Sequence, residues 1–124
     1  MDHNQAKKLC DNWLPAWTGG KDSVERLVSY YTEDAFYLDP AKPDGLTGHD
    51  ELRSYFEKLL QKNPDWYWKD EEIIPTEKGF VLKWIASVPL GSHTITVKGL
   101  DIVETVEDLI TRNEVYFDRS LLLR

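Results

Sequence analysis

The hydrophobic period of this 124-residue chain changes once, at Asn63-Pro64. Before that point apolar residues recur every three or four positions, which is the period of amphipathic helices. After it apolar and polar residues alternate, which is the period of half-buried strands. Helices followed by strands predict an α+β domain, in which a curved sheet packs over helices.

Three helices are expected in the first part. The first runs from about Asn4 to Trp17, and Pro15 should kink or end it. The second begins near Asp22–Glu25, where a capping side chain precedes a glutamate that can reach back to a free backbone donor. The third opens at Thr47–Asp50 and closes at Asn63-Pro64.

Five strands are expected, one in the first part and four in the second. Ala35–Asp39 is a short strand, and Pro40–Gly45 is a loop by its proline and glycine content. The later strands are Trp66–Thr76, Phe80–Val88, His93–Glu104 and Leu109–Asp118. Their short polar connections predict an antiparallel meander. We therefore expect a single domain, residues 1–124, with a curved antiparallel sheet over three N-terminal helices. The apolar end, Leu121–Arg124, is expected to pack on the pocket mouth or on a partner subunit.

Charge and cysteine content narrow the partners and the compartment. Fifteen Lys and Arg against 22 Asp and Glu give a net charge of −7, so neither nucleic acid nor an anionic membrane is an expected partner. No apolar run approaches the roughly 18–20 residues of a membrane span, and no signal-peptide core is present. The single cysteine, Cys10, cannot pair within the chain, which fits a reducing compartment. We predict a cytoplasmic protein.

No sequence motif predicts a metal or an organic cofactor. His3, His49 and His93 lack partners at helical spacing, and one cysteine cannot form a thiolate cluster. The phosphate-binding loop, the dinucleotide fingerprint and the Gly-x-Ser-x-Gly motif are all missing from the sequence. We therefore expect neither a metal nor a cofactor.

A family resemblance rests on four stretches, namely Trp13–Asp22, Tyr31–Pro40, Leu46–Leu52 and Arg112–Asp118. They resemble the SnoaL-like branch of the nuclear transport factor 2 superfamily. The second stretch, with Glu-Asp-Ala at its start and Asp-Pro at its end, is similar to one that recurs in polyketide cyclases and ketosteroid isomerases. The resemblance implies a cone-shaped sheet around a small-molecule pocket. It does not give a reaction, because the superfamily contains enzymes and non-enzymes.

Asp39 is the first candidate for proton transfer. It precedes Pro40 at the end of its strand and resembles the general base of ketosteroid isomerases, a carboxylate that takes a proton from a carbon next to a carbonyl. The alternative is structural, because Asp before Pro commonly opens and caps a turn.

Asp101 is the second candidate. It alternates with Ile95, Val97 and Val103, so it shares their apolar face, and burial should favour its protonated form. A neutral carboxyl can donate a hydrogen bond to a developing oxyanion, and by position Asp101 resembles the residue with that role in the isomerases. A register irregularity at Gly99 would instead turn Asp101 outward.

The remaining candidates are aromatic or lie on the last strand. Where ketosteroid isomerases carry a catalytic tyrosine this chain has Trp13, and Tyr30 or Tyr31 are possible substitutes for the missing phenol. Asp118 resembles the acid/base residue of SnoaL-like cyclases, and Tyr116 belongs to the same candidate site. The alternative for that strand is a solvated face with ion pairs, such as Arg112 with Glu114. Substrate contacts are expected from Trp13, Trp17, Tyr30, Trp84 and Tyr116.

These residues lead to three hypotheses. The first is a cofactor-independent isomerase or cyclase, in which pocket aspartates transfer protons on a largely apolar carbonyl or cyclic compound. The second is a non-catalytic ligand-binding or dimerisation module of the same fold, and the third is an epoxide or ester hydrolase. A small apolar or aromatic ligand should occupy the cone. A homodimer through the open face of the sheet is expected, because the strand at Phe80–Val88 is apolar on both faces. One face carries Phe80, Leu82, Trp84 and Val88 and the other carries Val81 and Ile85, and the face that does not cover the helices needs a partner.

Overall fold

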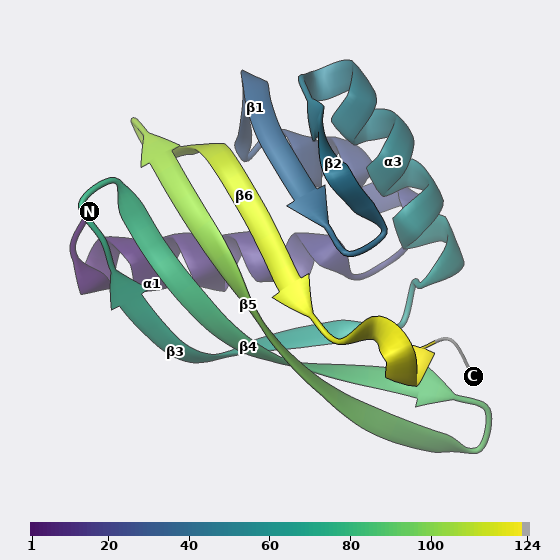
Figure 1. Cartoon of the computed structure of the whole chain (residues 1–124). Coiled ribbons are helices and arrows are strands. Elements are labelled where there is room, and N and C mark those ends of the chain that lie inside the picture. Colours follow the sequence, from purple (N-terminus) through teal and green to yellow (C-terminus); the bar gives the residue numbers. More distant parts are fainter. Residues whose placement is uncertain (123–124) are drawn as a thin grey trace.

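The computed structural model describes residues 1–122, and for residues 121 and 122 it describes the backbone only. The expectation that Leu121–Arg124 packs on the pocket mouth or on a partner concerns side chains outside the described part. The chain begins with helices and continues into a six-stranded sheet (Figure 1). None of the described helices has the length and apolar character needed to cross a bilayer.

The helices are α1, His3–Trp13, α2, Val24–Val28, and α3, His49–Lys62. Helix α1 begins with a capping box, in which Asp2 and Gln5 each accept a 2.8 Å bond from the other's backbone N–H. Pro15 has the expected effect, because α1 ends at Trp13 and a 3-10 turn, Leu14–Trp17, follows.

The expected cap of the second helix is not formed. A 3-10 turn, Lys21–Ser23, leads into α2 without any capping side chain. The Ser23 hydroxyl donates to the carbonyl of Ala16 at 2.6 Å, and Glu25 accepts from Arg53 of α3. Tertiary contacts therefore use the groups that the local sequence pattern assigned to a cap.

The strands are β1, Tyr31–Asp39; β2, Lys42–Thr47; β3, Tyr67–Pro75; β4, Gly79–Leu90; β5, His93–Val106; and β6, Leu109–Phe117. Their order in the sheet is β2-β1-β6-β5-β4-β3. The meander β3 to β6 is antiparallel, as predicted. The prediction of a wholly antiparallel sheet is wrong, however, because β1 lies parallel to β6. Short connections determine the pairing of strands that follow one another, and β1 and β6 are far apart in the sequence.

A second correction concerns the expected loop at Pro40–Gly45, because most of it belongs to strand β2. Strand β2 is at the sheet edge and pairs only with β1. An edge strand tolerates Pro43, since the missing N–H is not needed for a second neighbour. Gly45 has a φ of +83°, and a Cβ there would overlap the ring of Phe36, so this position of the strand requires glycine. The proline and the glycine that suggested a loop are therefore compatible with an edge strand.

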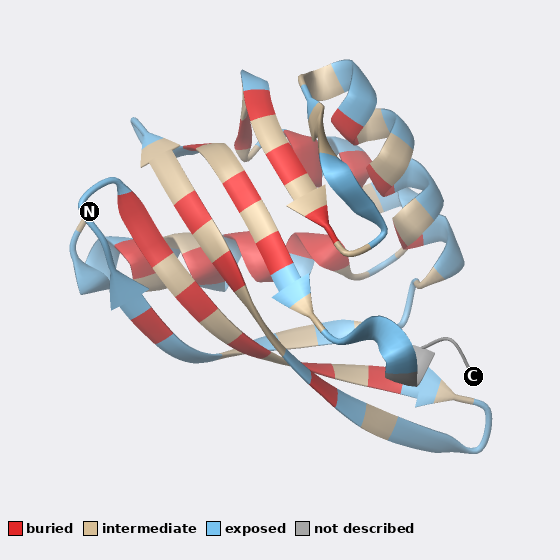
Figure 2. Cartoon of the chain, viewed as in Figure 1, coloured by how far each residue is buried: buried red, intermediate tan, exposed pale blue. Residues whose placement is uncertain are grey.

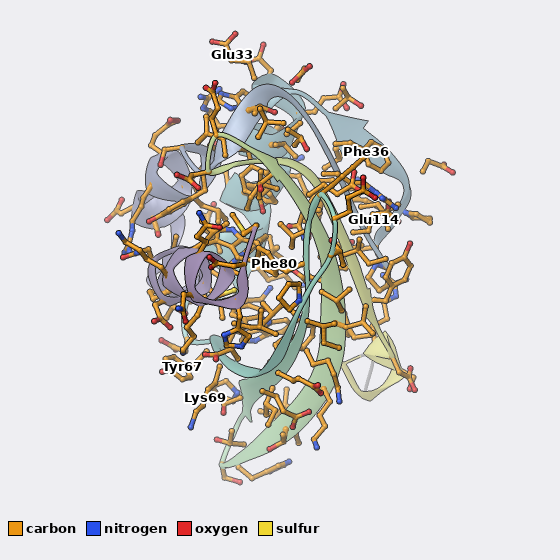
Figure 3. The ribbon with its side chains drawn as sticks, turned by 90° about the vertical axis from the view of Figure 1, so that its left-hand side faces the viewer. Glu33, Phe36, Tyr67, Lys69, Phe80 and Glu114 are labelled. Atoms are coloured by element: carbon orange, nitrogen blue, oxygen red, sulfur yellow. The ribbon has the colours of Figure 1, made fainter. Side chains whose placement is uncertain are left out.

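The three helices cover one face of the curved sheet, and the core lies between these two layers (Figure 1). Burial alternates along the strands, as Figure 2 shows. On β4 the inward residues are Phe80, Leu82, Trp84, Ala86 and Val88, all buried. In Figure 3 Phe80 points toward the helices, whereas Phe36 and Glu114 point away from them. The outward face carries ion pairs, including Lys98 with Glu71 at 3.4 Å.

Candidate functional site

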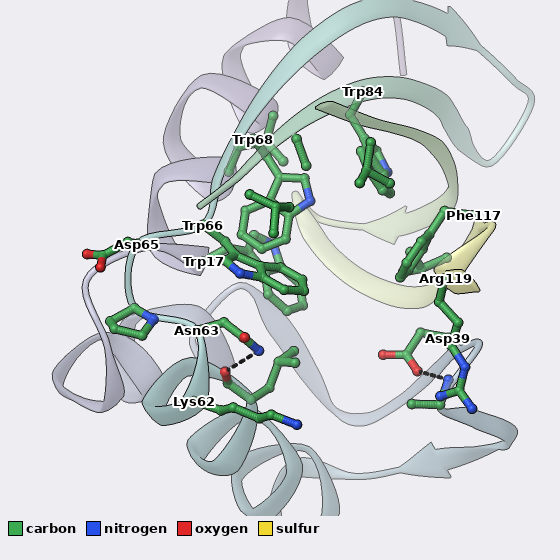
Figure 4. A pocket seen from close by; sticks show the side chains of 18 of the residues that line it. Trp17, Asp39, Lys62, Asn63, Asp65, Trp66, Trp68, Trp84, Phe117 and Arg119 are labelled. Atoms are coloured by element: carbon green, nitrogen blue, oxygen red, sulfur yellow. Dashed lines mark hydrogen bonds between the residues drawn. The ribbon is translucent and has the colours of Figure 1, made fainter. Parts of the chain in front are cut away.

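A cavity of about 620 Å³ lies between the end of α3, the 3-10 turn after α1, and the inward faces of β4 to β6. Trp17, Trp66 and Trp68 form one side of it, while Trp84 and Phe117 form another (Figure 4). The ring centroids of Trp17 and Trp68 are 6.0 Å apart, and those of Trp84 and Phe117 are 5.6 Å apart. A cavity of this size with aromatic walls suits a flat, largely apolar small molecule.

Asp101 is a carboxyl group on the wall of this cavity and is only 5% exposed. Strand β5 pairs with β4 without a shift through Gly99, so Asp101 keeps its inward direction, as predicted from the alternation. One carboxylate oxygen accepts from Trp84 Nε1 at 2.7 Å, and the other accepts from Asn113 Nδ2 at 3.0 Å. Donors on the two neighbouring strands, Trp84 on β4 and Asn113 on β6, therefore fix the Asp101 side chain.

Burial raises the pKa of Asp101 from 3.8 to about 6. Loss of water disfavours the charged form, and the charge of Asp39 acts in the same direction. The donors Asn113 and Trp84 oppose the shift, because they stabilise the carboxylate. Asp101 thus changes its protonation state close to neutral pH, where a group can act both as acid and as base.

Gly99 explains how Trp84 reaches Asp101. Gly99 lies opposite Trp84 in the β4–β5 ladder, and a Cβ at residue 99 would come within 2.5 Å of the indole ring. The missing side chain therefore leaves the space that the indole fills. In this position the indole N–H points at the carboxylate of Asp101.

Asn113 extends the contacts of Asp101 into the core. Its amide is fully buried, and Oδ1 accepts from the hydroxyl of Tyr31 at 2.8 Å while Nδ2 donates to Asp101. Asn113 was not among the site residues predicted from the sequence. A signal was present, because Asn113 alternates with Val115 and Phe117 and is the polar member of an apolar face, as Asp101 is on β5.

Asp39 also lines the cavity and is 7% exposed, but its carboxylate is already engaged. One oxygen accepts from the backbone N–H groups of Ala41 and Lys42, at 2.8 and 3.1 Å. The other accepts from the hydroxyls of Tyr37, at 2.8 Å, and Tyr55, at 2.6 Å. The first pair is the turn cap that we weighed as the structural alternative. The second pair fixes two phenols on the cavity wall, and neither was predicted from the sequence.

Burial and the neighbouring Asp39 carboxylate raise the pKa of both the Tyr37 and the Tyr55 hydroxyl. Desolvation is the main cause, because the charged phenolate loses more hydration energy on burial than the neutral phenol does. Both phenols therefore stay protonated at neutral pH and act as hydrogen-bond donors.

Of the other predicted residues, Trp17 and Trp84 line the cavity, whereas Trp13, Tyr30, Tyr116 and Asp118 are absent from the described lining. Trp13 is 0% exposed, and its Nε1 has no hydrogen-bond partner among residues 1–120. Its ring packs edge-on against Trp17 and Tyr31 in the core. The hydroxyl of Tyr30 donates to the carbonyl of Asn12 at 3.1 Å, away from the cavity.

The outward face of β6 carries Tyr116, which is 46% exposed and donates to Glu114 at 2.5 Å. Arg112 bonds to Glu114 and to Glu104 on this face. This is the solvated, ion-paired face of the alternative interpretation. Asp118 is exposed just after the strand, where the backbone N–H of Ser120 lowers the pKa of its carboxyl. Within the described residues, no three His, Cys, Asp or Glu side chains gather as a metal site would require.

Comparison with known proteins agrees with this fold. The family model described as a SnoaL-like domain matches residues 11–113, well over half of the chain. No curated protein matches the chain.

Three solved structures illustrate the likeness. A hypothetical protein from Catenulispora acidiphila with a ketosteroid isomerase-like fold, in complex with trimethylamine, has a TM-score of 0.76 at 16% identity, over 91% of this chain and 87% of that one. A protein from Shewanella putrefaciens, provisionally assigned as a SnoaL-like polyketide cyclase, has a TM-score of 0.78 at 13% identity, over 96% and 83%. An NTF2-like protein of unknown function from Burkholderia pseudomallei has a TM-score of 0.77 at 14% identity, over 100% and 97%.

At these identities the structures show a common fold and not a common reaction. The α+β arrangement of three N-terminal helices and a six-stranded mixed sheet is the nuclear transport factor 2-like fold. Together with the family match over residues 11–113, it shows that the chain belongs to the SnoaL-like domain family.

Proposed function

We propose that this protein is a cofactor-independent enzyme of the isomerase or cyclase type, which transfers a proton on a small, largely apolar carbonyl or cyclic compound. The observation that carries the proposal is Asp101, a buried carboxyl on the wall of an aromatic cavity, with a pKa of about 6. A group of this kind is matched to proton transfer near neutral pH.

The hydrogen bonds favour Asp101 over Asp39 as the proton acceptor. A carboxylate offers about four lone-pair sites, and Asp39 already accepts four hydrogen bonds. Asp101 accepts only one at each oxygen, so each oxygen has a further lone pair. In our proposal Asp39 is therefore a positioning residue that holds the phenols of Tyr37 and Tyr55.

The proposed step is proton abstraction next to a carbonyl. The ionised Asp101 takes a proton from the α-carbon, the C–H bond breaks, and its electron pair moves onto the carbonyl oxygen as an enolate. Tyr55, which is half-buried and lines the cavity, can turn its hydroxyl from Asp39 to donate to that oxygen. Return of the proton from Asp101 to another carbon completes isomerisation. In D₂O the Asp101 carboxyl first exchanges its proton for a solvent deuteron, and return of that deuteron to the α-carbon completes exchange.

The experiment follows the exchange of α-protons of 2-tetralone, a bicyclic ketone, in D₂O by proton NMR. The wild-type protein should accelerate exchange, and the rate should rise with pH through about 6, because Asp101 must be ionised to accept the proton. Asp101→Asn should lower the protein-catalysed rate by about 100-fold or more. Asp118→Asn is the matched control, since Asp118 is exposed and absent from the cavity lining.

Equal exchange rates in the wild type and in Asp101→Asn would overturn the proposal. If 2-tetralone also binds in calorimetry under those conditions, the cavity is a binding site without proton transfer, and the non-catalytic module is the correct hypothesis.

A further inference from the structure

The cavity has a basic opening that its aromatic interior does not account for. Its described lining contains three cationic side chains, Lys58, Lys62 and Arg119, and all three residues are exposed, whereas Asp101 and Trp84 are buried. Exposed lining residues mark the entrance and buried ones mark the interior. The cations therefore lie at the mouth, and the candidate acid/base lies inside.

The three cations come from two parts of the chain. Lys58 and Lys62 are four residues apart on α3, so they lie on the same side of that helix. Arg119 follows β6, and Figure 4 shows Lys62 and Arg119 on opposite sides of the cavity. Within the described residues none of the three has a carboxylate within 4.0 Å. Their charges are thus open to a ligand that enters between them.

Two acidic residues of the cavity lining, Asp39 and Asp65, do not cancel this charge. Asp39 is held by two phenols and two backbone N–H groups, so its charge is already compensated by donors. The carboxylate of Asp65 points away from the cavity in Figure 4. A fourth cation, Lys42, stands over the ring of Tyr55 at 5.6 Å from the centroid, and Tyr55 is itself part of the lining.

The negative net charge of the protein makes a basic opening unusual. The chain has a net charge of −7, so an anionic molecule is repelled by most of its surface. Basic side chains that converge on the entrance give such a molecule a favourable approach there. They also orient it, since a charged end at the mouth leaves the uncharged part for the tryptophan walls.

We propose that the natural ligand is a planar aromatic or polycyclic compound with an acidic group, a carboxylate or an acidic phenol. The acidic group lies at the mouth between Lys62 and Arg119, with Lys58 nearby. The ring system packs among the tryptophans, and the far end of the ligand reaches Asp101. This inference rests on the proposed function and specifies its substrate class.

The test compares two probes that share one ring system, 2-naphthoate and the neutral 2-naphthamide, by isothermal titration calorimetry. We expect 2-naphthoate to bind at least about 5-fold more tightly, and its affinity to fall as NaCl rises from 0.05 to 0.5 M. The double variant Lys62→Gln/Arg119→Gln should weaken 2-naphthoate by about 5- to 10-fold, as expected for two exposed ion pairs. It should leave 2-naphthamide within 2-fold.

Lys78→Gln is the matched control, because Lys78 is exposed in the β3–β4 turn and absent from the cavity lining. It should change neither affinity. Equal affinity of the two probes in the wild type, or equal weakening of both by the double variant, would overturn the inference. Absence of binding by either probe would overturn it as well. The exchange assay with Asp101→Asn decides the proposed function separately, because 2-tetralone carries no charge.

Discussion

Replacement of Asp101 by asparagine should remove the free-energy cost of holding an ionised carboxyl in the folded protein, a cost that depends on pH. The pKa of Asp101 rises from 3.8 to about 6 on folding, and at 1.36 kcal/mol per unit the ionised form costs about 3 kcal/mol. A raised pKa means that the folded state binds the proton more tightly. Stability is therefore full below pH 3.8, declines as the pH rises, and levels off above about pH 6.

Asparagine has no such titration, but it changes the hydrogen bonds. Its oxygen can accept from Trp84, and its amide N–H₂ then faces Asn113, which must turn its own amide over to accept. The Tyr31 hydroxyl must also reorient, because in the wild type it donates to Asn113 Oδ1, which turns away in the variant. These rearrangements cost about 1–3 kcal/mol at every pH. At pH 7.5 the variant should therefore be as stable as the wild type or more stable.

The assay is urea unfolding of both proteins from pH 4.5 to 7.5. The free energy of unfolding of Asp101→Asn minus that of the wild type should increase by about 2 kcal/mol over this range. Asp118→Asn should change little with pH over this range, because the pKa of Asp118 is 3.8 in the unfolded state and lower in the folded state, so this carboxyl is ionised in both. A difference between Asp101→Asn and the wild type that does not change with pH would refute the reasoning, because it would mean that Asp101 is ionised throughout.

Three more variants test the surroundings of Asp101 and the sheet. Gly99→Ala should destabilise the fold by about 1–3 kcal/mol in chemical denaturation, because the added methyl overlaps the Trp84 ring; unchanged stability would contradict this. Asn113→Leu should raise the pKa of Asp101 above 6 in an NMR titration, since the carboxylate loses a donor, and an unchanged value would show that the donor is unimportant. We also expect a homodimer through the outward face of the sheet, which carries Ile85 of β4. Ile85→Glu should dissociate it in light scattering at micromolar concentration, and a monomeric wild type would count against it.

Much of the candidate site could be predicted because it depends on local alternation. Asp101 lies among apolar residues at every second position, and the sequence therefore predicted its inward direction and its raised pKa. The same logic, applied to β6, would have found Asn113. Trp13 was misplaced for a different reason. The helical period shows that Trp13 faces inward, but an inward side chain can lie either in the core or on the cavity wall. Its packing against Trp17 and Tyr31 places this ring in the core.

The chain order of helices and strands follows from the sequence alone, because the hydrophobic period reports which side of each segment is buried. The family resemblance was also visible in short stretches such as Tyr31–Pro40, and the match to the family over residues 11–113 confirms it. The edge strand β2 was hidden, since its proline and glycine indicate a loop unless the strand has a single neighbour.

Only the tertiary structure decided which distant groups meet. The parallel pairing of β1 with β6 brings Tyr31 to Asn113 and, through it, to Asp101. It also places Asp39 on the same cavity as Asp101, with two phenols bound to its carboxylate. The physical reason is the range of the forces. Periodicity and turn chemistry act between neighbours in the chain, whereas the pKa of a carboxyl depends on every donor, charge and excluded water around it, whatever their place in the sequence.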